Sequence, residues 1–499
     1  MRHKNSRKTV AKKRRAGGRW HLPSFRYGHK YVTGCTYYWK VEDAQEACHM
    51  KSLWSDTVQF PKQKKLTADL RCQNVVIGAG MTGILIAYFL QEKGQEVIVL
   101  EANELASGQT KNTTAKITSQ HGCMYHDMIK SCGIERTTAY AKANETAIQL
   151  YKEIITKEGI ACHFEELPSF LYTQNEQGME RLKKETKAAK ALEITAEYVR
   201  GDKIKELPFG VMGAVKFEGQ AQFHPLEFIQ AIAEKLTIYE HTNVLEVDEH
   251  FVITEKHVIV ADNVIFATHY PFPIVPGFYF LRQHQSRSYV IAIEGEGVPE
   301  YLDGMYYGMD KDGLSFRHAQ EKLLVGGGSH RTGKKDKRNG FCHLKEQVKK
   351  CYPNAELVAQ WAAQDCMPHD GIPFIGRFSL KHDNWYVATG FQKWGMTSAM
   401  ISAMIISDII TGKENPYAFA FSPQRLLVKA GYKKFMMDVG ESILGIGRGL
   451  FVKKSQRCTH MGCALVWNEE EESWDCPCHG SRYTKDGENI DNPAQTMLK

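Results

Sequence analysis

Four residues near the C-terminal end have the types and spacing of a metal-cluster ligand set. Cys458 and His460 lie in the segment Cys-Thr-His-Met-Gly-Cys, and Cys476 and His479 lie in the segment Cys-Pro-Cys-His-Gly-Ser. Two thiolates and two imidazoles can hold a [2Fe–2S] centre, with both cysteines on one iron and both histidines on the other. Zinc is the alternative, although zinc ribbons usually repeat Cys-x-x-Cys and the first pair here is Cys-x-His.

The sequence around both segments resembles Rieske domains of the respiratory and photosynthetic type. This resemblance implies that Cys463 and Cys478, one beside each ligand pair, form a disulfide between the cluster loops. It also implies that Ser481 and Tyr483 place hydroxyl donors near the cluster sulfurs, unless they are ordinary surface hydroxyls. Hydrogen bonds to sulfur stabilise the reduced cluster, so they would move its potential toward the upper part of the roughly −150 to +300 mV Rieske range.

A second group of residues has the pattern of a dinucleotide site. A buried strand, a glycine turn, a helix and a second strand are expected to follow one another over residues 74–100. Gly78 suits the tight turn, Gly80 lets the backbone approach a pyrophosphate, and Gly83 lets the helix and strand pack closely. The helix N-terminus stabilises phosphates, and Glu101 ends the second strand where it can accept from ribose hydroxyls. The complete pattern predicts dinucleotide binding.

Four later segments favour FAD over NAD. Residues 106–116, 263–268, 370–376 and 387–397 resemble, in this order, the FAD-binding segments of the D-amino-acid-oxidase-like superfamily. Its glycine/sarcosine-oxidase-like and gamma-glutamylputrescine-oxidoreductase-like members are the most similar single-domain enzymes. We expect FAD to be bound non-covalently, because no cysteine is clearly placed for a covalent bond to the flavin. Cys366 is expected to be a small buried residue.

The resemblance also implies which residues contact FAD, and most of them belong to the glycine, serine and threonine segments. The expected FAD contacts are Gly78, Gly80, Met81, Thr82, Gly83, Glu101, Ala102, Ser107, Gly108, Thr110, Thr113, Thr114, Ala115, Val244, Ala267, Thr268, Gly371, Gly390, Lys393, Trp394, Gly395, Met396 and Thr397. Trp394 is expected to abut the flavin or to be a core tryptophan.

Residues 271–350 are expected to form an antiparallel roof over the flavin, and they offer candidates for binding a substrate carboxylate. The candidates are Arg282, Arg317, His318, His330 and Arg331. Arginine suits this role because its fork is bidentate, although any one of these residues could equally be structural. His224 is expected to position a loop. No catalytic base is assigned, since hydride transfer does not require one.

The charge of the chain is unevenly distributed. Its 499 residues carry a net charge of +7, but residues 1–49 hold twelve Lys/Arg and three Asp/Glu, which leaves −2 for the remainder. Overall basicity is therefore no argument for nucleic-acid binding. Residues 1–49 are a disordered basic tail, a nucleic-acid arm, or untranslated sequence. We favour the last, because codons for residues 45–47 can contain a ribosome-binding site before Met50.

The motifs divide the chain into an N-terminal arm, an oxidoreductase part, a linker and a Rieske part. Their expected ranges are 50–72 for the arm, 73–412 for the oxidoreductase (FAD-binding 73–160, 222–270 and 355–412; roof 161–221 and 271–354), 413–424 for the linker and 425–499 for the Rieske domain. Residues 176–206 are expected to be helical. No apolar run reaches the roughly 18 residues of a membrane helix, and the scattered cysteines suggest a reducing, cytoplasmic compartment.

The expected fold is an α/β Rossmann-like FAD domain with an interleaved antiparallel-sheet substrate domain (α+β), followed by a small all-β Rieske domain. The resemblance implies an enzyme that oxidises CH–NH or CH–NH₂ groups of an amine or amino acid. Electrons from FADH₂ would pass singly through the cluster to an external acceptor. Alternatives are an electron-transfer or redox-sensing flavo-iron-sulfur protein, a reductase with reversed electron flow, and a zinc-stabilised tail.

Overall fold

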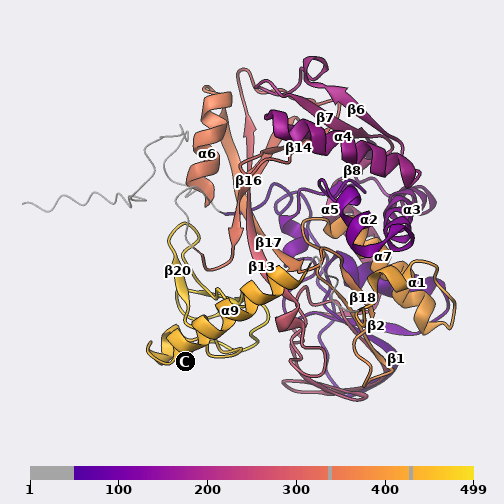
Figure 1. Cartoon of the computed structure of the whole chain (residues 1–499). Coiled ribbons are helices and arrows are strands. Elements are labelled where there is room, and N and C mark those ends of the chain that lie inside the picture. The colour runs from indigo at the N-terminus through magenta and orange to yellow at the C-terminus, as the bar shows by residue number, and fades with distance from the viewer. Residues whose placement is uncertain (1–49, 335–339, 426–430, 499) are drawn as a thin grey trace, which may run out of the picture. The chain divides into compact units, whose positions relative to one another are not determined.

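The structure is a computed structural model that describes residues 50–334, 340–425 and 431–498. All of these residues belong to one compact unit (Figure 1). The predictions made for residues 1–49 lie outside the described residues.

The dinucleotide fingerprint lies in an eight-stranded sheet. Its strands are β1 (Leu70–Ile77), β2 (Val97–Leu100), β9 (Ile238–Tyr239), β10 (Val244–Asp248), β11 (Phe251–Thr254), β12 (Val258–Phe266), β18 (Phe374–Arg377) and β19 (Trp385–Thr389). The central strands β2, β1, β12 and β19 are parallel, whereas β10, β11 and β18 add antiparallel pairs. The apolar end of β1 is buried on both faces, as a parallel strand covered from two sides requires.

Helices cover this sheet and position its glycine turn. They are α1 (Met81–Glu92), α2 (Tyr125–Cys132), α3 (Ile134–Glu158), α5 (Pro225–Ala233), α7 (Gly395–Ile410) and α8 (Ala418–Phe421). The central pair is α1 and α7, which pack against each other in the lower right of Figure 1. Both are apolar on nearly all sides, which is typical of helices buried in a core.

The predicted interleaved sheet is confirmed as a second eight-stranded sheet. Its strands are β5 (Ser169–Thr173), β6 (Ala196–Arg200), β7 (Gly213–Phe217), β13 (Gln283–Glu294), β14 (Met305–Gly308), β15 (Ser315–Ala319), β16 (Lys322–Arg331) and β17 (Glu356–Pro368). All its pairs are antiparallel except β5 with β14. We call it the roof sheet. Helices α4 (Glu176–Ala191) and α6 (Gly340–Cys351) pack against it. The helix predicted over 176–206 is too long, because residues 196–200 pair with β7 instead.

A third, small sheet consists of β3 (Lys116–Ile117), β4 (Glu165–Glu166) and β8 (Ala221–Gln222), with β8 in the middle. The C-terminal part is a four-stranded antiparallel sheet preceded by α9 (Tyr432–Gly449). Its strands are β20 (Val466–Asn468), β21 (Ser473–Asp475), β22 (Arg482–Thr484) and β23 (Asn489–Asp491). The predicted small β domain is therefore confirmed, and in Figure 1 it lies in yellow beside the lower end of β13.

Candidate functional site

A cavity of about 700 Å³ lies between the first sheet, the roof sheet and the C-terminal part. Its walls include the glycine turn after β1, roof residues of β13 and β16, and the segment 489–495 of the C-terminal part, in which every residue except Pro493 lines the cavity. This volume is within the usual range for cofactor sites, and the lining mixes apolar surface with a few polar groups.

The glycine turn forms one end of the cavity. Gly78 has φ +106°, and its N–H donates to the carbonyl of Leu100 at 2.8 Å. A Cβ on Gly78 would lie 2.6 Å from the carbonyl oxygen of Ala267, and a Cβ on Gly83 would lie 1.9 Å from that of Gly78. Helix α1 is thus held close against the turn, with its first N–H groups at the cavity. This cradle fits the pyrophosphate of a dinucleotide.

Glu101 lies at the end of β2 and also lines this end of the cavity. Its carboxylate accepts from the N–H of Ala79 at 2.8 Å and from the N–H of Asn103 at 2.9 Å. Burial raises the pKa of Glu101, while these backbone donors oppose the rise. The carboxylate is therefore fixed beside the turn, where it can accept from a ribose hydroxyl.

The roof end of the cavity carries charged groups. Asp365 accepts from the hydroxyl of Ser288 at 2.9 Å, and Lys393 donates to the hydroxyl of Ser329. Burial raises the pKa of Asp365, and the nearby charge of Lys393 opposes the rise. Burial, together with the charge of Arg317, lowers the pKa of the Lys116 ammonium group to about 7. These groups face a cavity in which a small polar substrate could be held.

Trp394 closes the cavity between two aromatic side chains. Its ring stacks on His121 with a centroid distance of 4.8 Å, and it lies 5.4 Å from the ring of Tyr307. Both Trp394 and Tyr307 line the cavity, so this pair presents a rigid apolar surface to whatever binds there.

Most of the residues predicted to contact FAD line this one cavity, although they come from segments far apart in the sequence. Five of them are not part of its wall. These are Gly83, Ala115, Gly371, Gly390 and Thr397. Gly83 instead allows the helix to pack against the turn. Cys366 is buried and also lies outside the wall, with its sulfur 3.4 Å from Nε2 of His269.

The candidates for a substrate carboxylate lie elsewhere. Arg282 donates to the carbonyl of Pro423 and packs over the ring of Phe374, and Arg331 donates to carbonyl oxygens of the C-terminal part. Arg317 donates to the carbonyl of Ala115 at 2.9 Å. The remaining candidates also have structural partners. His318 bonds to Glu165, His330 to Tyr289, and His224 caps α5. Sequence reasoning instead missed Asp365 and the lining residues from 489 to 495, and it gave Lys116 no role of its own within the segment 106–116.

The four predicted cluster ligands lie on two loops that the disulfide between Cys463 and Cys478 joins. The thiols of Cys458 and Cys476 are both buried, and the rings of His460 and His479 are 5.0 Å apart between centroids. Nδ1 of each histidine is buried without a hydrogen-bond partner among the described residues. Two buried thiols and two unpartnered imidazole nitrogens are the donors that a [2Fe–2S] cluster of this type requires.

Burial also sets the protonation state of the two histidines. It lowers the pKa of His460 to about 4, and together with the charges of His460 and Arg331 it lowers the pKa of His479 to about 3. Both imidazoles are therefore neutral at neutral pH and can donate a lone pair to iron. The hydroxyl of Ser442 lies 3.5 Å from Nε2 of His479, which leaves Nδ1 free to face the cluster.

The residues around the cluster ligands lie as the Rieske resemblance implies. The predicted disulfide between Cys463 and Cys478 is confirmed. The hydroxyl of Tyr483 lies 3.4 Å from the sulfur of Cys458, and the hydroxyl of Ser481 accepts from the N–H of Ala494 at 3.0 Å. Neither residue is an ordinary surface hydroxyl, since both side chains are fully buried.

Two glutamine side chains connect the cluster loops to the cavity. Nε2 of Gln285 donates to the carbonyl of His479 at 2.8 Å and to that of Asn492 at 2.7 Å. Nε2 of Gln364 donates to the carbonyl of Gly480 at 2.8 Å. Asn492 and Gln364 both line the cavity. The side chain of Gln285 therefore connects the backbone of the cluster ligand His479 directly to the cavity wall.

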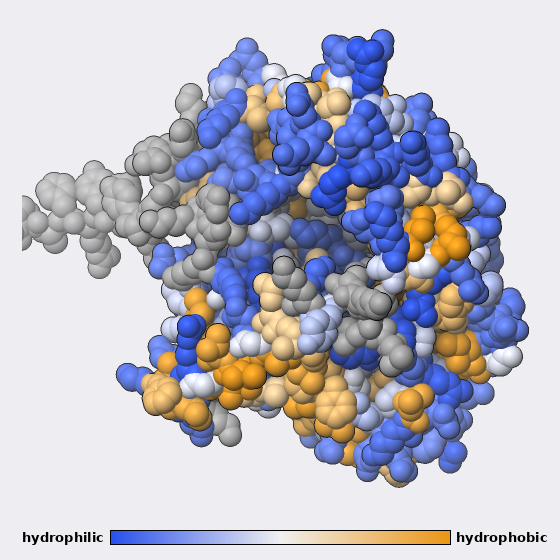
Figure 2. Space-filling view, viewed as in Figure 1, coloured by the Kyte–Doolittle hydropathy of each residue, from blue (hydrophilic) through white to orange (hydrophobic). Residues whose placement is uncertain are grey.

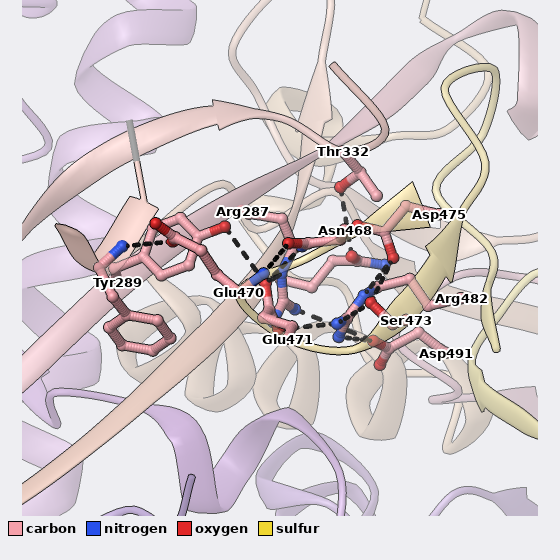
Figure 3. A network of polar contacts seen from close by, with 12 residues as sticks. Arg287, Tyr289, Thr332, Asn468, Glu470, Glu471, Ser473, Asp475, Arg482 and Asp491 are labelled. Atoms are coloured by element: carbon pink, nitrogen blue, oxygen red, sulfur yellow. Dashed lines mark hydrogen bonds and ion pairs between the residues drawn. The ribbon is translucent and has the colours of Figure 1, made fainter. Parts of the chain in front are cut away.

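A buried ion network fixes the C-terminal part to the roof sheet. Glu471, on the loop before β21, bonds to Arg287 of β13 and to Arg482 of β22 (Figure 3). Arg482 also bonds to Asp475 at 3.0 Å and to Asp491 at 3.1 Å. The network thus holds β23, and with it the cavity-lining residues 489–495, against the roof sheet.

Comparisons with known proteins agree with this geometry. A family model described as FAD dependent oxidoreductase (DAO) matches residues 74–409, and a Rieske [2Fe-2S] domain model matches residues 431–499. The chain is 32% identical over 498 residues to the Bacillus subtilis (strain 168) protein YhfW, which is named as a Rieske 2Fe-2S iron-sulfur protein. That match covers 90% of this chain and 97% of YhfW.

Two further similarities concern the separate parts. Over 42 residues the chain is 50% identical to the cytochrome b6-f complex iron-sulfur subunit 3 of Nostoc sp., which covers 8% of this chain and 24% of that subunit. The glycine oxidase of Geobacillus kaustophilus superposes with a TM-score of 0.61 at 18% identity, covering 72% of this chain and 100% of the oxidase. The similarity to the glycine oxidase shows that the two proteins share a fold.

Within the described residues, every helix is too short or too polar to span a bilayer. The two family matches imply FAD and a [2Fe–2S] cluster as cofactors, and the glycine cradle and the buried Cys/His set fit them. The chain therefore belongs to the DAO family of FAD-dependent oxidoreductases and carries a C-terminal Rieske [2Fe–2S] domain.

Proposed function

We propose that the protein oxidises an amine or amino acid and passes the electrons through its Rieske cluster to an external acceptor. The observation that carries this proposal is the shared wall, since residues 489–495 of the Rieske domain line the same cavity as the dinucleotide fingerprint. When bound, FAD accepts two electrons as a hydride, and the cluster carries electrons one at a time. The predicted lining residues would hold FAD without a covalent link, because Cys366 lies outside the cavity wall.

The amide contacts of Gln285 and Gln364 support this electron route. They give short hydrogen-bonded connections from the carbonyls of His479 and Gly480 to the cavity. A Cβ on Gly480 would lie 2.5 Å from Cβ of Gln285, so the cluster loop approaches the roof sheet as closely as the backbone allows. The buried hydroxyls of Ser481 and Tyr483 favour the reduced cluster, which makes it the better electron acceptor.

The charges at the roof end favour an amino acid or a related amine as the substrate. Asp365 can accept from a substrate nitrogen, and Lys393 and Lys116 can bind a carboxylate. Arginines are not needed for this, and none lines the cavity among the residues that the structure describes. The fold shared with a glycine oxidase supports the same substrate class.

Replacement of Asp365 by asparagine tests the substrate assignment. We expect the second-order rate constant for flavin reduction by an active amine to fall about 100-fold, because a charged hydrogen bond to the substrate nitrogen is lost. Anaerobic flavin bleaching with glycine, sarcosine, L-proline and simple amines would measure it without an electron acceptor. Glu356→Gln, an exposed change on the same strand, is the control. Equal rates for both variants would contradict this role.

A redox titration tests the direction of electron flow. We expect the cluster, followed by EPR, to have a midpoint potential well above that of the flavin, followed by visible absorbance, because hydroxyl donors stabilise the reduced cluster. A cluster midpoint below that of the flavin would reverse the direction and favour a reductase. A normal titration without flavin bleaching by any amine would favour an electron-transfer module.

A further inference from the structure

Helix α9 lies directly against the cluster loops, and its inner face is built for this contact. A Cβ on Gly445 would lie 2.3 Å from the sulfur of Cys478, and a Cβ on Gly449 would lie 1.9 Å from the carbonyl oxygen of Gly462. Asp438, also on this face, pairs with Arg331 and with His284 of the roof sheet. The helix is therefore fixed in position, and its orientation decides what its outer face presents.

The outer face of α9 is apolar and exposed. Tyr432, Met436, Ile443 and Leu450 follow one another at intervals of four or seven residues, so they form one stripe along the helix. Ile443 is 66% exposed and Leu450 is 69% exposed. Met437, Leu444 and Phe451 widen the stripe, with Phe451 89% exposed. Figure 2 shows hydrophobic surface in the lower left, where Figure 1 places α9.

The unpaired charges around this stripe are positive. Lys434, Arg448, Lys453 and Lys454 are exposed on or just after the helix. The two acidic residues of α9 do not balance them, because Asp438 is buried in its ion pairs and Glu441 pairs with Lys334. The described part of the chain thus presents an exposed apolar stripe bordered by cations.

We infer that the outer face of α9 docks on an anionic membrane surface. An amphipathic helix with large apolar residues and a cationic border lies in the plane of such a surface, with its apolar side among the lipid chains. Basic residues near the surface add attraction to anionic headgroups. Docking would place the cluster loops, on the opposite side of α9, next to the membrane. If the proposed function holds, the external acceptor is then one held at the membrane.

Vesicle co-sedimentation of the full-length protein with both cofactors tests docking independently of turnover. We expect binding to vesicles of phosphatidylcholine mixed with phosphatidylglycerol, and weaker binding to phosphatidylcholine alone. Leu444→Ser should weaken binding about tenfold, because a large apolar side chain no longer enters the lipid. The matched control is Leu380→Ser, which changes a leucine that is 89% exposed outside α9. Arg448→Glu should weaken binding to the anionic vesicles alone about tenfold.

Residues 1–49 are unchanged in these variants, so their basic charge cannot explain a difference between them. The flavin and cluster spectra show whether each variant is folded. Equal binding of Leu444→Ser and the wild type would overturn the inference, as would a failure of the wild type to bind. A wild-type dimer that Leu444→Ser dissociates, without vesicle binding, would assign the face to a second copy of the chain instead.

Discussion

Replacing Cys476 by serine is expected to abolish the EPR signal of the reduced cluster while an active amine still bleaches the flavin. Cys476 is fully buried and supplies one of the two thiolates that hold the cluster. We therefore expect reduction of cytochrome c to fall at least about 100-fold. Cytochrome c is a suitable acceptor because a protein of its size cannot enter a cavity of about 700 Å³.

The control for this variant is Cys132→Ser, which removes a thiol from α2, outside both the cavity wall and the cluster loops. It should leave both the EPR signal and cytochrome c reduction unchanged. If Cys476→Ser loses the signal but still reduces cytochrome c at the wild-type rate, electrons leave directly from the flavin, and the proposed route is wrong. If flavin bleaching is also lost, the cluster has a structural role in forming the cavity.

The cluster ligands and the glycine turn could be predicted because their chemistry needs residues that are close in sequence. Cys458 and His460 are two residues apart, and the turn after β1 must place its glycines at fixed positions before α1. Such local geometry is encoded in short segments. The pairing of Cys463 with Cys478 followed from the Rieske resemblance, and the structure confirms it.

The roof end of the cavity could not be predicted in this way. Which side chains of β13 and β17 face the cavity depends on their register, which pairs Ser286 with Asp365 and Ser288 with Ala363. Sequence reasoning therefore selected arginines by type for a substrate carboxylate, whereas the structure brings Asp365 and Lys116 to the cavity, beside Lys393, which was predicted to contact FAD. Residues 489–495 carry no local signal either, because they line the cavity only after the Rieske domain has docked.

Helix α9 was missed for a different physical reason. It contains several glycines, which disfavour helix in isolation. Gly445 and Gly449 are required because a side chain at either position would collide with the cluster loops. Tertiary packing thus overrides local propensity here, as it does at residues 196–200, which pair as β6 instead of extending α4.

Replacing Glu471 by glutamine is expected to lower the free energy of unfolding by about 3–5 kcal/mol, because it leaves buried arginines without their main counter-charge. The side chain of Arg287 is only 3% exposed, and its close ion pair is with Glu471. Arg482 keeps Asp475 and Asp491, so the loss is concentrated at the contact between the roof sheet and the Rieske domain. Urea unfolding followed by circular dichroism would measure it.

The pH dependence gives this prediction a second, independent signature. Burial alone would raise the pKa of Glu471, but the charges of Arg287 and Arg482 hold it at about 2, below its ordinary value of 4.5. A depressed carboxyl pKa stabilises the fold above the ordinary value, and this stabilisation is lost as the pH falls toward 2. The difference between wild type and Glu471→Gln should therefore shrink on acidification. Glu472→Gln, an exposed neighbour, should stay within about 0.5 kcal/mol of wild type. If it destabilises the protein as much as Glu471→Gln does, the buried ion network is not what holds the Rieske domain in place.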